Sequence, residues 1–397
     1  MPRQANALWF FKKMPAIWLA LMLSAGCADG GSALVQALGL GYKVVENVDL
    51  SPRRVAFDHA AKRCPVSRGG VAQTVFDHTA KHHLQESHCL ATGKGVTIAV
   101  VGTGLDPANP FIQGNIRGGV NLSGVGPEKD LEDRQGLGTA VAGLAAGQMG
   151  AAPEAGILAV KVWSQTWRSP AATARGVGWA ISHGAQIVVL AGNVKPSLPE
   201  RWRALLSRAL AAGALIIAPA GDQGQDLCRA PARHPASLAA PALLKVTGLS
   251  FRRDALTPGA NFCPAKVDLA IWGGGDEKRI ETLWAYRAMN RPWPAGGAAR
   301  PPDHLADADW IIRKEGSALA AGLAAGVAAL VWQSLPPNLS RPAQARAVRE
   351  ILLRSGRPAP ALSGRVKSGR ALDALDAVRE TPAYLGLTAA EKPGPPQ

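Results

Sequence analysis

The sequence predicts an α/β fold built on a mostly parallel central sheet. Short apolar runs rich in β-branched residues recur along the chain, each followed by a glycine turn and a helical stretch: Val96–Val101, Ile187–Leu190 and Leu215–Ala218. Apolar runs of this kind, without polar alternation, are typical of parallel strands covered on both faces. Hydrophobic residues make up 47% of the 397 residues, so the chain can fill a large core.

The first 26 residues have the features of a secretory signal. Basic residues at positions 3, 12 and 13 precede the apolar run Met14–Gly26, which is too short to span a membrane. The run ends in Leu-Ser-Ala-Gly-Cys, which resembles a bacterial lipobox, so Cys27 would be the lipid-modified first residue. The next position lacks the aspartate that retains lipoproteins at the inner membrane. We expect a periplasmic-side, outer-membrane lipoprotein; ordinary cleavage nearby and an uncleaved anchor are the alternatives.

Residues 27–83 are predicted to link this signal to the folded domain. Five of the eight histidines lie between positions 59 and 88, and His78 and His82 are one helical turn apart. Such a spacing suits zinc or copper. No Cys-x-x-Cys or His-Glu-x-x-His pattern accompanies these histidines, so we favour solvated helix histidines and predict no metal and no cofactor.

Four segments form a series with a characteristic order and spacing. Three are Gly95–Asp106, Gly136–Gly147 and Gly316–Leu330, and the fourth reads Ala-Pro-Ala-Gly-Asp-Gln-Gly and includes Gly221. Together they resemble the subtilisin-like serine peptidases. The resemblance implies a three-layer α/β/α sandwich with a mostly parallel sheet over residues 84–380, followed by a Pro-rich tail at 381–397.

The catalytic positions of that family hold unsuitable residues in this sequence. Gly102 stands at the aspartate position, Leu137 at the histidine position and Ala318 at the serine position. These side chains offer no carboxylate, no proton acceptor and no nucleophilic oxygen. Asp222 stands at the asparagine position of the oxyanion hole, where a carboxylate would repel a developing oxyanion. The resemblance therefore implies a pseudoprotease without catalytic residues.

Three functions remain open after this comparison. Ser317 is the candidate nucleophile of an atypical serine endopeptidase, but one residue turns a helical side chain by about 100°, away from the cleft. A structural subunit of an envelope assembly is the second possibility. We favour the third, an exported and lipid-anchored binding or scaffolding module with a protein or peptide partner in the cell envelope.

The cysteines fit an exported protein. Setting Cys27 aside leaves an even number, as disulfide bonding requires. The sequence also resembles the aqualysin and proteinase K branch, where cysteines at similar places to Cys228 and Cys263 are paired. This resemblance implies a Cys228–Cys263 disulfide and leaves Cys64 and Cys89 for each other. Buried free thiols are the alternative for all four.

An insertion at residues 276–314 replaces a shorter connection of the family. It contains Trp284, Trp293 and Trp310, and tryptophan is common at binding hot spots. These residues are candidate binding residues beside the former cleft. Tryptophans that fold back onto the domain are an equally good interpretation.

The formal net charge is +15 and the isoelectric point is about 10.0. In a cytosolic protein this charge would suggest nucleic acid. The predicted signal argues for anionic envelope surfaces instead, such as lipid headgroups, lipopolysaccharide or an acidic partner. We therefore predict no nucleic-acid partner.

Overall fold

The computed structural model describes residues 82–386, apart from 165–167, 194–198, 231–234, 236, 252–254, 276–278, 284 and 286–310. Five residues with predicted roles lie outside this part of the chain, and their roles stay predictions: Cys27, Cys64, Trp284, Trp293 and Trp310. His78 also lies outside it. Within the described residues, no helix has the length and apolar character needed to cross a membrane.

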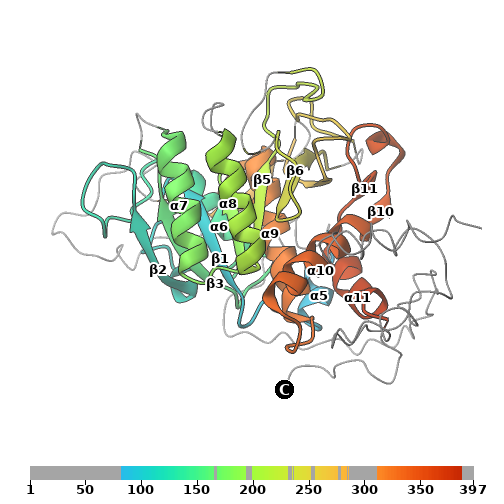
Figure 1. Ribbon diagram of the computed structural model, residues 1–397, viewed down its shortest axis with the longest axis horizontal. Coiled ribbons are helices and arrows are strands. Elements are labelled where there is room, and N and C mark those ends of the chain that lie inside the picture. Colours follow the sequence, from blue (N-terminus) through green and yellow to red (C-terminus); the bar gives the residue numbers. More distant parts are fainter. Residues whose placement is uncertain are drawn as a thin grey trace, which may run out of the picture. The chain divides into compact units, whose positions relative to one another are not determined.

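A nine-stranded sheet forms the centre of the domain (Figure 1). Its order is β10-β11-β7-β6-β5-β4-β1-β3-β2, and all neighbouring strands are parallel except β10 and β11. The strands are β1 (Thr97–Gly102), β2 (Ile116–Asn121), β3 (Gly156–Lys161), β4 (Ile187–Leu190), β5 (Leu215–Pro219), β6 (Leu243–Leu249), β7 (Leu269–Trp272), β10 (Arg357–Pro358) and β11 (Arg370–Ala371). Every residue of β3 to β7 is buried, which explains their mostly apolar sequence.

Helices cover both faces of this sheet. Figure 1 shows α7 and α8 in front of it, with α6 and α9 behind, and α10 packs beside α8. The helices are α5 (Leu84–His88), α6 (Leu137–Ala145), α7 (Pro170–Ser182), α8 (Pro199–Ala212), α9 (Ser317–Gln333), α10 (Arg341–Arg354) and α11 (Ala374–Tyr384), with short 3-10 turns at Gln113–Asn115 and Pro360–Leu362. The fold is the three-layer α/β/α sandwich that the sequence predicts.

Helices α6 and α9 are in backbone contact. A Cβ atom on Gly322 of α9 would lie 2.6 Å from the carbonyl oxygen of Val141 in α6, and one on Gly326 would overlap the carbonyl oxygen of Ala145. Only glycine permits so close an approach. Helix α9 is buried along almost its whole length, which matches its apolar sequence on all sides.

The ends of the predicted insertion form a small antiparallel sheet of β8 (Ile280–Leu283) and β9 (Ile311–Lys314). The hydroxyl of Thr282 donates to the carbonyl oxygen of Ala140 at 2.6 Å, and Leu283 packs on Gly143. The base of the insertion is therefore ordered and rests on α6.

Candidate functional site

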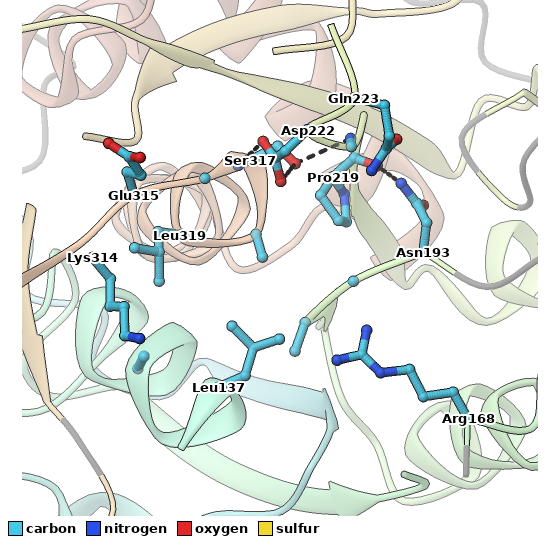
Figure 2. A pocket seen from close by; sticks show the side chains of 16 residues that line it. Leu137, Arg168, Asn193, Pro219, Asp222, Gln223, Lys314, Glu315, Ser317 and Leu319 are labelled. Carbon is cyan, nitrogen blue, oxygen red and sulfur yellow. Dashed lines mark hydrogen bonds between the residues drawn. The ribbon is translucent and has the colours of Figure 1, made fainter. Parts of the chain in front are cut away.

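A pocket of about 280 Å³ lies where β4, β5 and the first turns of α6 and α9 meet (Figure 2). In a parallel sheet the carboxyl ends of neighbouring strands share one edge, which is where such folds bind ligands. The residues that line the pocket are Leu137, Ala140, Arg168, Ala191, Gly192, Asn193, Pro219, Gly221, Asp222, Gln223, Lys314, Glu315, Gly316, Ser317, Ala318 and Leu319. Three of the four positions singled out in the sequence thus line one pocket, and Gly102 lies outside its lining.

The start of α6 is fixed by Asp133, a buried residue that sequence analysis missed. One of its carboxylate oxygens accepts from the backbone N–H of Gly136 at 2.7 Å, and the other accepts from the N–H and hydroxyl of Thr139 at 2.9 Å. A carboxylate at a helix N-terminus satisfies backbone donors that otherwise lack partners. This cap holds Leu137 at the pocket, where its alkyl side chain forms part of an apolar floor.

Gly102 ends β1 in a place with no room for a side chain. A Cβ atom there would lie 2.6 Å from the Cβ of Ala191, a residue of the pocket lining. Real Cβ atoms do not approach each other so closely, so any larger residue at position 102 requires Ala191 to move.

Asp222 binds the first turn of α9. Its carboxylate accepts from the backbone N–H of Ser317 at 2.7 Å and from the Ser317 hydroxyl at 3.0 Å. The same hydroxyl oxygen accepts from the N–H of Gly221 at 3.0 Å, so Ser317 is both donor and acceptor, and it is fully buried. Figure 2 shows these contacts closing one side of the pocket. Sequence analysis did not find the pair, because the two residues are 95 positions apart.

The carboxyl group of Asp222 sits in a mixed environment. The residue as a whole is exposed, but its carboxylate is turned towards buried Ser317. Partial burial raises the pKa of Asp222 above its ordinary value, and the hydrogen bonds from Ser317 oppose this increase because they favour the charged form. The site therefore carries a partly buried carboxylate at the N-terminus of α9, where the helix dipole favours negative charge.

Polar and charged groups surround the apolar floor. The guanidinium of Arg168 lies 4.8 Å from the ring centre of Trp163, and Figure 2 shows it directed into the pocket opposite Leu137. The side-chain amide of Asn193 donates to the carbonyl oxygen of Pro219 at 2.7 Å and joins two segments of the lining. Lys314 extends from β9 on the other side of Leu137. Nothing in the sequence motifs pointed to Arg168 or Asn193.

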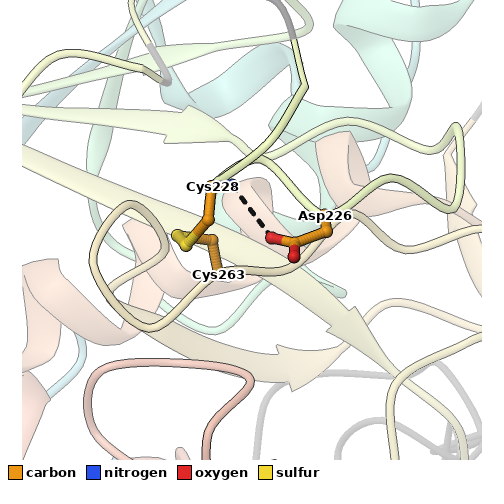
Figure 3. A group of neighbouring side chains, drawn as sticks. All are labelled: Asp226, Cys228 and Cys263. Carbon is orange, nitrogen blue, oxygen red and sulfur yellow. Dashed lines mark hydrogen bonds between the residues drawn. A yellow bond between two sulfur atoms is a disulfide. The ribbon is translucent and has the colours of Figure 1, made fainter.

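The predicted Cys228–Cys263 disulfide is present (Figure 3). Asp226 lies beside it, and its carboxylate accepts from the backbone N–H of Cys228 at 2.9 Å. The two sulfur atoms and one carboxylate oxygen lie within 4.8 Å of one another. Metal ligation by cysteine requires thiolates, and both sulfurs are used in the disulfide, so this group does not fit a metal ion in its oxidised state.

Three histidines of the N-terminal cluster are described: His82 is buried, contrary to the expected solvated position, and His83 and His88 have separate partners. His83 contacts the carboxylate of Asp373 at 2.8 Å, and His88 contacts the carbonyl oxygen of Ala151 at 2.8 Å. These contacts tie α5 to other parts of the domain. They give the two side chains structural roles at the surface.

Comparison with known proteins agrees with this architecture. The family model described as the subtilase family matches residues 93–370. Subtilisin NAT of Bacillus subtilis subsp. natto is 27% identical over 229 residues, which cover 52% of this chain and 55% of that protein. Thermitase of Thermoactinomyces vulgaris is 32% identical over 163 residues, covering 38% of this chain and 56% of the relative. The chain thus spans about half the length of the curated relatives it matches.

Solved structures show the same fold. The structure of the subtilase cytotoxin SubAB assembly superposes with a TM-score of 0.61 at 21% identity, covering 77% of this chain and 96% of the other. A cold-adapted subtilisin-like serine proteinase gives a TM-score of 0.53 at 21% identity, covering 71% and 88%. The family match spans most of the chain, and three of the four motif positions line one pocket. The chain therefore belongs to the subtilase family.

Proposed function

We propose that this subtilase-family domain is catalytically inactive and acts as a polypeptide-binding module in the cell envelope. The observation that carries the proposal is the lining of the pocket, where Leu137, Asp222 and Ala318 stand together. Hydrolysis by this family needs a base, a nucleophile and a donor to the oxyanion. Leu137 cannot act as the base, Ala318 has no nucleophilic oxygen, and an ionised Asp222 cannot donate to the oxyanion.

The expected loss of turnover is so large that it favours an inactive protein over a slow enzyme. Removal of the serine or the histidine alone from an active subtilisin lowers turnover about a million-fold. The activity that remains there depends on the oxyanion hole. Here Asp222 brings a carboxylate to that region, and a negative group opposes the charge that develops in the transition state.

Ser317 is a poor substitute for the missing nucleophile. Its oxygen already accepts from the backbone N–H of Gly221, and its proton is directed to Asp222 within the protein, so the hydroxyl is engaged in the fold. The side chain is also fully buried. An atypical serine endopeptidase is therefore the weaker alternative.

A direct test combines turnover with active-site labelling. The full chain should release no peptides from casein and should not react with a serine-directed fluorophosphonate. Labelling that disappears in Ser317→Ala would establish Ser317 as a nucleophile and overturn the proposal.

Binding is supported by the pocket itself, which persists without catalytic groups. It offers an apolar floor at Leu137 and Ala318 with polar groups around it, as sites for polypeptide segments commonly do. Its family relatives include proteases, which act on polypeptides. We expect unfolded casein labelled with fluorescein to bind, with an increase in fluorescence anisotropy.

A pair of variants distinguishes the pocket from the rest of the surface. Ala318→Phe fills the pocket and should weaken casein binding at least tenfold. Ala204→Phe, at an exposed position of α8, adds the same group elsewhere and should leave binding unchanged. No binding by the unaltered chain, or equal loss in both variants, would favour a structural subunit instead.

Export and lipid attachment are a separate part of the proposal. They are supported by the signal-like N-terminus and by the disulfide, since disulfides persist in oxidising compartments. Metabolic labelling with an alkyne fatty acid should mark the chain in a Gram-negative host, and Cys27→Ser should abolish the label. Labelling that survives this substitution would exclude Cys27 as the attachment site.

A further inference from the structure

Three neighbouring helices carry an unusual set of charges. Together, α7, α8 and α10 contain eight arginines, two glutamates and no lysine. The arginines are Arg175, Arg201, Arg203, Arg208, Arg341, Arg346, Arg349 and Arg354. These helices pack side by side, α7 against α8 and α8 against α10, so their charges lie on one part of the molecule.

The two glutamates are neutralised within the same helices. Glu200 pairs with Arg203, and Glu350 pairs with Arg349 at 3.0 Å. Arg349 also reaches Asp268 at 3.0 Å, inside the domain. In the described part of the chain, the other six arginines form no ion pair, and all six are exposed: Arg175, Arg201, Arg208, Arg341, Arg346 and Arg354. We call the surface formed by these six the arginine face.

Contacts between the helices make the arginine face continuous. Arg208 of α8 donates to the hydroxyl of Ser182, the last residue of α7, at 2.7 Å. Arg341 of α10 donates to the carbonyl oxygen of Gly184 at 3.0 Å, and Gly184 lies two residues after Ser182. Both guanidinium groups therefore meet at the end of α7, and Figure 1 shows α7 and α8 running alongside each other there.

An aromatic pair lies within the same surface. Trp179 of α7 is half-buried and stacks on exposed His183, with the ring centres 3.8 Å apart. Arg175 precedes Trp179 by one helical turn, and Ser182, the partner of Arg208, follows it. Tryptophan flanked by basic residues is typical of the interface between a membrane and water, where the ring lies among headgroups.

We propose that the arginine face docks onto a membrane surface through its anionic lipid headgroups. The guanidinium group has a planar set of donors that matches phosphate oxygens. The charges are spread over the outer sides of three helices, which suits a broad, flat partner. None of the residues that line the pocket belongs to these helices, so the arginine face and the pocket are built from different residues.

Binding of the full chain to lipid vesicles tests this proposal. Vesicles that contain phosphatidylglycerol should sediment the protein, and pure phosphatidylcholine vesicles should bind it at least tenfold more weakly. The comparison between the two lipids isolates the headgroup charge. The basic N-terminal segment also prefers anionic vesicles, so the matched charge variants are needed to assign the contact to the arginine face. Increasing sodium chloride from about 0.05 M to 0.5 M should remove the difference, since salt screens surface charge.

Matched charge variants locate the contact. Arg201→Gln, Arg208→Gln and Arg346→Gln together remove three charges from the arginine face. Each basic residue near an anionic surface contributes about fivefold in affinity, so the triple variant should lose roughly 100-fold. Lys129→Gln, Arg229→Gln and Lys367→Gln remove the same charge from exposed loop positions and should lose less than fivefold.

Three results would overturn the proposal. They are equal binding to both kinds of vesicle, equal loss in the two triple variants, and unchanged binding by the arginine variant. Sedimentation with duplex RNA but not with anionic vesicles would assign the arginine face to a different partner. Circular dichroism melting of both variants checks that each is folded, and Arg201→Gln alone should still lose about fivefold.

Discussion

The carboxylate of Asp222 joins the loop after β5 to the first residue of α9, because it accepts both the backbone N–H and the hydroxyl of Ser317. It occupies the end of the helix as a capping side chain would. Active subtilisin-like enzymes use an asparagine at this position to bind an oxyanion, whereas here the position binds the protein's own helix. In this chain the side chain at this position is engaged in hydrogen bonds within the fold.

Removing this carboxylate should therefore destabilise the domain. We expect Asp222→Ala to lower the free energy of unfolding by about 1–2 kcal/mol, the usual cost of a lost helix cap. Urea denaturation followed by circular dichroism measures the change. Glu128→Ala, at an exposed position outside any helix, is the control and should change stability by less than about 0.5 kcal/mol. Equal effects of the two substitutions would show that Asp222 is only a surface residue.

The stability provided by Asp222 should depend on pH. Its pKa is raised in the folded protein, so the folded state binds a proton more readily than the unfolded state. The pH-dependent part of its contribution is fully present below the pKa of the unfolded carboxyl, about 4, and is lost as pH rises through the folded pKa, which leaves the part due to the hydrogen bonds to Ser317. The difference in unfolding free energy between the unaltered chain and Asp222→Asn should thus shrink from pH 3.5 to pH 7. A difference that grows over this range would contradict the direction of the shift.

Restoring four side chains should not restore proteolysis. We expect Gly102→Asp, Leu137→His, Asp222→Asn and Ala318→Ser together to give little or no cleavage of casein. A residue larger than glycine at position 102 meets the Cβ of Ala191 at 2.6 Å, and catalytic groups must be held to within about 0.5 Å.

The control for this experiment is the same variant with Ala318 retained. Strong casein cleavage by the fourfold variant, abolished in that control, would show that the pocket is still arranged for catalysis. It would then indicate that activity was lost recently.

The disulfide should make a large contribution to stability. Cys228 and Cys263 are 35 residues apart, and closing a loop of this length is worth about 3–4 kcal/mol when the unfolded chain is flexible. Replacing both with serine should lower the unfolding free energy by this amount in urea titrations. The unaltered chain in excess dithiothreitol should match the variant. A reductant effect much larger than the effect of the double substitution would point to a second disulfide.

The sequence predicted the sheet well because its signals are local. The run Ile187–Leu190 coincides with β4, and Leu215–Ala218 differs from β5 by one residue. Burial on both faces leaves a continuous apolar run, which is readable without knowledge of the fold. The positions of Leu137, Asp222 and Ala318 at one pocket followed from the order and spacing of motifs.

Interactions between distant segments were not predictable in the same way. The bond between Asp222 and Ser317 and the stacking of Arg168 on Trp163 depend on how loops meet at the sheet edge. The base of the insertion was expected as a long connection, but β8 and β9 pair with each other across residues 284–310. Strand pairing over such a separation leaves no periodic signal in either strand alone.

The backbone contact of α6 and α9 at Gly322 and Gly326 sets the spacing of the two helices that border the pocket, whereas the side chains of the lining set its chemistry. Backbone atoms set the distance between the two helices, and the side chains at positions 137 and 318 project beyond that contact. Substitution of the side chains at positions 137 and 318 therefore leaves the spacing of the two helices unchanged. A lineage can thus lose a reaction by a few substitutions and retain a cleft of nearly constant dimensions, on which selection for recognition alone can act.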